Sequence, residues 1–290
     1  MMRRPVRSAA RGFTLIEAVI VIVIIGVIGA IVGVFIRMPI QGYADSVARA
    51  EVTDEADLAL RRIARDLRLA LPNSIRVNAD GSAIEFLLTK TGGRYLSAED
   101  EMGGEVLDFI DPTKLSFAVV GPMPGLARAV AGDYVVVNNL GEGMRPSDAY
   151  GLTSVDRNIA RIAGVDAAAG RITLADNPFA QQTTPMPSPT HRFQVISGAV
   201  SYRCAAASDG TLVLTRHWGY AITTQQNAPP VGPGRAAPLA SRLANCRLFE
   251  VDTAAARRSA LVLLTLALKA RNESDPIIQL VHQVHVDNTP

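Results

Sequence analysis

A single charged side chain, Glu17, interrupts the apolar stretch at residues 13–36. A charge inside a bilayer costs about 2.5–3.5 kcal/mol on insertion scales, so such residues usually have a partner and a function. Cleavage between Gly12 and Phe13 would supply a partner, because it leaves Phe13 with an α-amino group that is protonated near neutral pH. The carboxylate of one subunit would then neutralise a neighbour's amine and favour lateral assembly. The alternative is that Glu17 reaches the cytoplasmic interface as an ordinary residue at a helix end.

The chain has two cysteines, Cys204 and Cys246, and they do not form a CxxC motif. In an oxidising compartment we expect them to form one structural disulfide; a reactive thiol pair is the weaker alternative. The bridge would close a loop of roughly 40 residues and contribute about 3–4 kcal/mol on the chain-entropy model.

The other polar residues show no catalytic or metal-binding pattern. G-x-S-x-G, H-E-x-x-H and P-loop motifs are absent. His282 and His285 are three residues apart, so on a strand they point to opposite faces and a shared metal site is not expected. The acidic run Glu99-Asp100-Glu101 lacks the spacing of a calcium loop; a solvated cluster is favoured, with calcium binding as the alternative. The sequence therefore predicts no enzyme, no metal and no cofactor.

The charge distribution argues against nucleic acid as a partner. The 290-residue chain has a net charge of +2, but four arginines lie in its first twelve residues, at positions 3, 4, 7 and 11. The rest of the chain carries a small excess of acidic groups, and aromatic residues make up only 5%. Neither a basic patch nor a stacking surface for nucleic acid is predicted.

The apolar stretch at residues 13–36 is a candidate membrane span. As an α-helix it covers roughly 36 Å, and a bilayer core is about 30 Å thick. The arginines before it place the N-terminus in the cytoplasm and the body outside, in the periplasm of a cell with two membranes. A secretory signal has a shorter apolar region of about 7–15 residues with a small-residue cleavage site. An uncut signal anchor explains the length and orientation but not Glu17.

The segment Arg11-Gly12-Phe13-Thr14-Leu15-Ile16-Glu17 resembles the cleavage signature of type IV prepilins and type II secretion pseudopilins. The resemblance implies that residues 1–12 are a leader peptide. A prepilin peptidase would cut after Gly12 and methylate the amine of Phe13, and Glu17 would guide docking. An assembly ATPase and a platform protein of the inner membrane would then build the subunit into a filament with other major and minor pilins.

The amphipathic pattern continues after the apolar stretch, over residues 43–71, so we expect one N-terminal helix over residues 13–71 that ends at Pro72. Apolar residues recur at helical spacing, and Arg61, Arg62, Arg65, Asp66 and Arg68 occupy most of the polar side. A solvated face is favoured for this stripe over a lipid- or DNA-binding patch, and contact with acidic neighbours in a filament is the functional alternative.

After Pro72 the apolar period changes to two, which predicts a β-rich globular domain over residues 72–290. A hairpin is expected around Ser208-Asp209-Gly210, and the proline-rich stretches 185–189 and 229–238 are expected to be surface loops. The fold class is therefore α+β: a long N-terminal helix packed on antiparallel sheets, which by resemblance is the pilin or pseudopilin fold. The strands are expected at residues 82–90, 107–109, 115–120, 133–138, 171–174, 191–203, 211–220, 247–251, 259–270 and 276–286.

Four segments carry a finer resemblance: residues 60–68, 71–74, 192–204 and 282–290. They are similar to minor pilin-like biogenesis proteins of the mannose-sensitive haemagglutinin (MSHA) type IV pilus. The Arg-Asp-Leu helix and large β body also resemble the J-type minor pseudopilin of type II secretion. The resemblance implies a low-copy subunit of an initiation or tip complex. A secretion pseudopilin, an adhesive tip module and a membrane-anchored periplasmic enzyme are the alternatives.

Overall fold

The computed structural model describes residues 12–100, 103–227, 229–230, 232–252, 259–270 and 276–289, without the side chains of residues 37–41. Most of the proposed leader and Glu101 lie outside these residues. The chain divides into two compact units, Met1–Glu51 and Val52–Pro290.

The N-terminal unit contains the start of α1, a helix that runs over Leu15–Leu67. Its first part, Leu15–Ile36, is 22 residues long with a mean hydropathy of 3.3 and none of it is buried. By length and composition it is the one helical segment among the described residues that is able to cross a membrane.

The part of α1 within the second unit is amphipathic, as expected. Its apolar stripe follows helical spacing, and Val52, Ala56, Leu60, Ile63 and Leu67 are all buried.

The helix ends at Leu67, four residues before the predicted end. The reason is backbone competition, because residues 69–71 run beside β2 (Ala83–Tyr95). The N–H of Leu71 donates to the carbonyl of Leu87, and the N–H of Thr89 donates to the carbonyl of Leu69, both at 2.8 Å. The sheet therefore takes the hydrogen bonds that another helical turn would need.

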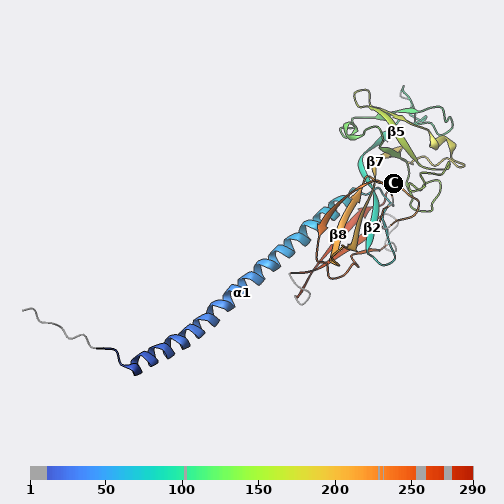
Figure 1. Cartoon of the computed structure of the whole chain (residues 1–290). Coiled ribbons are helices and arrows are strands. Elements are labelled where there is room, and N and C mark those ends of the chain that lie inside the picture. The colour runs from blue at the N-terminus through green and yellow to red at the C-terminus, as the bar shows by residue number, and fades with distance from the viewer. Residues whose placement is uncertain are drawn as a thin grey trace, which may run out of the picture. The chain divides into compact units, whose positions relative to one another are not determined.

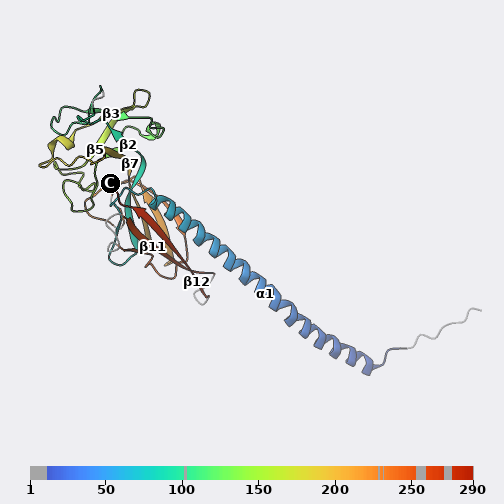
Figure 2. The ribbon, with the colours of Figure 1, turned by 180° about the vertical axis from the view of Figure 1, so that it is seen from behind.

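The body is built from two antiparallel sheets, so the α+β architecture is confirmed (Figures 1 and 2). The nine-stranded sheet has the order β1-β2-β3-β6-β5-β4-β7-β8-β9, and the three-stranded sheet has the order β10-β11-β12. Besides β2, the strands are β1 (Arg76–Val77), β3 (Ser116–Val120), β4 (Tyr134–Val136), β5 (Ile159–Asp166), β6 (Arg171–Leu174), β7 (Arg192–Ala206), β8 (Leu212–Trp218), β9 (Arg235–Ala240), β10 (Phe249–Asp252), β11 (Ser259–Lys269) and β12 (Ile277–Asp287).

An additional pairing between β2 and β7 closes part of the large sheet into a barrel. The ring runs β2-β3-β6-β5-β4-β7 and returns to β2, so six antiparallel strands enclose one core. The two long strands belong to both parts of the sheet: the first half of β7 pairs with β4, and its second half pairs with β8. β2 and β7 are thus shared by the barrel and by the part of the large sheet beside α1, and β3 to β6 complete the barrel.

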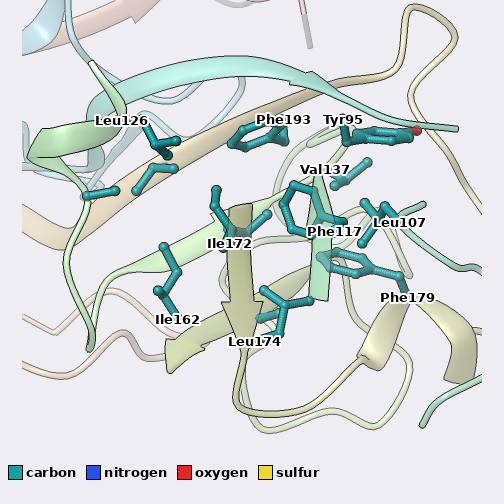
Figure 3. Packing of buried hydrophobic residues seen from close by; sticks show 14 residues of the cluster. Tyr95, Leu107, Phe117, Leu126, Val137, Ile162, Ile172, Leu174, Phe179 and Phe193 are labelled. Carbon is teal, nitrogen blue, oxygen red and sulfur yellow. The ribbon is translucent and has the colours of Figure 1, made fainter. Parts of the chain in front are cut away.

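Apolar side chains fill the barrel, as Figure 3 shows. Phe117 of β3 and Phe193 of β7 meet edge to face, with ring centroids 5.4 Å apart. A Cβ atom on Gly93 of β2 would lie 2.8 Å from the sulfur of Met123 and 3.1 Å from two ring carbons of Phe193, so glycine lets this strand approach the aromatic pair closely. The barrel therefore has a core of its own.

Most predicted strands are confirmed, including the β7–β8 hairpin and the strand rather than helix at residues 259–270. The prediction of a strand at residues 107–109 is wrong. The Asp108 carboxylate accepts hydrogen bonds from the backbone N–H groups of Ile110 and Asp111, and these bonds form a turn. The expected loop at residues 229–238 overlaps β9, which pairs with β8. Strands β1 and β5 were not predicted.

Candidate processing site and anchoring clusters

Thr14 and Glu17 determine where α1 begins. The N–H of Glu17 donates to the side-chain oxygen of Thr14 at 3.4 Å, and the N–H of Ala18 donates to the Thr14 carbonyl at 3.1 Å. Thr-x-x-Glu is the pattern of a capping box, and an acidic residue in the first turn is favoured by the helix dipole. Glu17 therefore has a local role at the helix start in addition to any role in assembly.

The residues around the predicted cleavage point are accessible. Phe13 is 72% exposed, and Leu15 and Ile16 are more than half exposed. Further along, a Cβ atom on Gly26, Gly29 or Gly33 would meet no described atom within 4 Å. An apolar surface of this extent must be covered by lipid or by another protein.

A buried ionic cluster joins the second part of α1 to the sheet. The Asp66 carboxylate accepts the hydroxyl of Tyr202 at 2.7 Å and Nε of Arg216 at 2.8 Å. All three side chains are buried, and Asp66 is only 6% exposed. Burial and the Asp66 charge raise the pKa of Tyr202, so its hydroxyl remains a proton donor. The sequence interpretation placed Asp66 in the solvated stripe, and this placement is wrong because Asp66 is buried.

A second buried cluster lies on β1 and β2, at the face of the same sheet opposite to Tyr202, because Tyr202 is paired with Ile84 and Glu85 is the next residue. Two guanidinium nitrogens of Arg76 donate to Oε1 of Glu85, and the hydroxyl of Tyr220 donates to Oε2 of Glu85 at 2.9 Å. The Arg76 guanidinium also stacks on the ring of Tyr150, 3.7 Å from its centroid. This cluster ties β1 and β2 to the segments that follow β4 and β8.

Asn73 connects the end of the helix to the C-terminal tail. Its side-chain amide donates to the carbonyls of Asn139 and Asn288, at 2.9 and 3.1 Å. Its backbone has a φ of +60°, a left-handed conformation that asparagine tolerates better than most residues. Two segments far apart in the sequence, 71–74 and 282–290, therefore meet in the fold.

Comparison with known protein families finds the prokaryotic N-terminal methylation motif at residues 7–33. No curated protein and no solved structure matches the chain. The motif supports a type IV pilin-like protein with a pilin or pseudopilin role, in a type IV pilus or in type II secretion. It implies processing by a prepilin peptidase and assembly with other pilins, and it suggests a structural rather than an enzymatic protein.

Cys204 and Cys246 form a disulfide, with their Cα atoms 5.3 Å apart. Cys204 lies on β7, and Cys246 lies in the segment that leads into β10. The bridge thus links the large sheet to the start of the small one.

Groups that suggested other chemistry have local partners. His282 is half-buried and His285 is exposed, and their side chains lie on opposite faces of β12. The described residues contain no cluster able to hold a metal ion. Asp100 accepts hydrogen bonds from the backbone of Ser97 and from Arg94, which lower its pKa to about 2. The calcium alternative for residues 99–101 stays untested, because Glu101 is not described.

Sequence reasoning missed the Asp66 cluster and the Glu85 cluster. One signal was available for the first: Asp66 lies next to Leu67 and three residues after Ile63, within the apolar stripe. No comparable signal marks Glu85, since its partners come from distant segments.

Proposed function

We propose that this chain is a minor pilin of the MSHA type, similar to MshO, and a structural subunit in the initiation or tip complex of a type IV pilus. The observation that carries the proposal is the methylation motif at residues 7–33, which leads directly into the exposed apolar part of α1. Residues 1–12 are the leader, residues 13–71 the membrane and amphipathic segment, and residues 72–290 the periplasmic body. Before assembly the chain lies in the inner membrane with its N-terminus in the cytoplasm.

The assembly chemistry follows from the first residues. Cleavage after Gly12 creates the α-amine of Phe13, which the peptidase methylates and which keeps its positive charge. Glu17 of one subunit pairs with that amine on its neighbour, so two charges that are costly in lipid neutralise each other. The apolar helix then exchanges lipid for the helices of other pilins, and the platform protein and ATPase extract it into the filament.

Contacts among the four resembling segments support the MSHA-type assignment. Asp66 from residues 60–68 bonds Tyr202 from residues 192–204, and Asn73 bonds Asn288 of the tail. Each contact joins two of the four segments, so all four take part in holding the helix and the tail to the body. A minor pseudopilin of type II secretion uses the same processing chemistry and is the alternative within the class.

The inserted barrel favours a second candidate, an adhesive tip module. It has its own core, and its strands β3 to β6 are additional to the strands beside α1, with which it shares β2 and β7. Loops on a rigid barrel are a common location for binding sites. Loss of surface attachment on deletion of the strands that only the barrel uses, β3 to β6, with pilus assembly intact, would support this role.

The test is the mass of the N-terminal peptide of the protein purified from its native membranes. We expect a chain that begins at N-methylated Phe13, and one that begins at Met1 when the peptidase is absent. A Glu17→Gln variant should be processed normally but should be lost from filaments. A chain that keeps residues 1–12 in peptidase-competent cells would exclude the pilin function and leave a signal anchor.

A further inference from the structure

The outer edge of β12 is an open strand edge. β12 pairs with β11 along its whole length, from Ile277 opposite Lys269 to Asp287 opposite Ser259, without a register shift. Among the described residues no strand pairs with its other side. The backbone N–H and C=O groups on an open edge have no ladder partner, and such an edge is a template for another strand.

The other sheet edges carry features that discourage pairing. β1 is only two residues long. β9 contains Pro238, and its register with β8 is irregular between Leu214 and Thr215. β10 is four residues long and carries Glu250 and Asp252. The barrel strands close on each other and leave no edge.

These protections are weakest on β12. It is 11 residues long and contains no proline, glycine or lysine, and its one carboxylate, Asp287, is the last residue. Two apolar side chains on its outer face, Ile277 and Val281, are each 56% exposed. Such a long, regular and weakly charged edge is a liability unless a partner covers it.

We propose that the outer edge of β12 binds an extended segment of another pilin-like subunit, which adds a fourth strand to the β10-β11-β12 sheet. The occupant is an extended chain because N–H and C=O groups at strand spacing are matched only by another strand. The lack of charge along the edge indicates recognition by backbone and by apolar side chains that cover Ile277 and Val281. A different pilin-like subunit is the partner because the methylation motif implies assembly with other pilins. The inference rests on the proposed function.

Amide hydrogen exchange of the full-length chain in detergent tests this edge. The chain is measured alone and in the complex extracted with its pilin-like partners from native membranes. We expect the open amides of residues 277–287 to exchange about tenfold more slowly, or slower still, in the complex, since an added strand closes them. Barrel amides, such as those of residues 159–166, should not change.

A charged substitution separates strand pairing from general contact. Val281→Lys is tolerated by the fold because the side chain is exposed, but it places a charge directly beside the cross-strand apolar side chains of the added strand. It should abolish both the protection and the co-extraction of the partners. Val155→Lys makes the same change at another exposed valine, between β4 and β5, and should preserve both.

Three results would overturn the inference. The first is unchanged exchange of residues 277–287 in a complex that contains the pilin-like partners. The second is equal behaviour of the two lysine variants. The third is protection that develops in the isolated chain with the mass of a dimer, which would identify a second copy as the occupant. The N-terminal mass from the same sample reports cleavage after Gly12, so failure of the proposed function is recognised separately.

Discussion

Removal of the Asp66 carboxylate should strongly destabilise the body. Asp66→Ala leaves the Arg216 guanidinium, which is 8% exposed, buried without its counter-charge. Breaking one partner of a buried pair costs about 3–5 kcal/mol. With a urea slope of about 2–3 kcal/mol per molar, the unfolding midpoint should fall by about 1–2.5 M. Tyr202→Phe removes one hydrogen bond but keeps the ion pair, so we expect it to lower the free energy of unfolding by about 1–2 kcal/mol.

The same helix provides a matched control. Asp57 also forms an ion pair four residues along α1, with Nε of Arg61 at 2.6 Å, but the Arg61 side chain is 72% exposed. Asp57→Ala should therefore cost no more than about 0.5 kcal/mol.

The fluorescence of Trp218, the one tryptophan of the chain, is a suitable readout of urea unfolding in detergent. The Arg216 guanidinium lies 4.9 Å from the centroid of its ring. Equal losses of stability for Asp66→Ala and Asp57→Ala would refute the argument, because the buried cluster would then contribute no more than a surface pair.

Two further predictions concern the body. Replacing both Cys204 and Cys246 by alanine should lower the free energy of unfolding by about 4 kcal/mol on the chain-entropy model, for a separation of 42 residues; an unchanged urea midpoint under oxidising conditions would contradict this. Burial and a neighbouring arginine lower the pKa of His217 from its ordinary value of 6.5. As the pH falls, His217 therefore takes up its proton at a higher pH in the unfolded chain than in the folded one. The free energy of unfolding that depends on neutral His217 is present above about pH 6.5 and is lost as the pH falls below it. His217→Gln should make the urea midpoint less dependent on pH between about 7.5 and 5; an identical pH profile would exclude this role.

Elements were predicted correctly from the sequence where one physical requirement acts on consecutive residues. The apolar stretch at residues 13–36 predicts its helix because every backbone group in lipid must bond within the segment. The β7–β8 hairpin is likewise predicted by its Asp-Gly turn and alternating flanks.

Boundaries and unpredicted strands depended on distant partners. The helix ends at Leu67 because β2 competes for the following backbone groups. β9 forms in spite of Pro238 because β8 offers a ladder beside it. Neither partner can be identified from a sequence window around the element itself.

The sequence by itself determined the processing signature, the membrane-length helix, the α+β class and a cysteine pair available for a bridge. These depend on residue type and on spacing along the chain. The tertiary structure alone decided that β2 and β7 close a barrel, that Asp66 is buried against Tyr202 and Arg216, and that no strand of the described residues covers the outer edge of β12. The physical reason is that the β2–β7 pairing and the Asp66 cluster join segments about 100 residues apart or more, as Asp66 and Tyr202 are with a separation of 136.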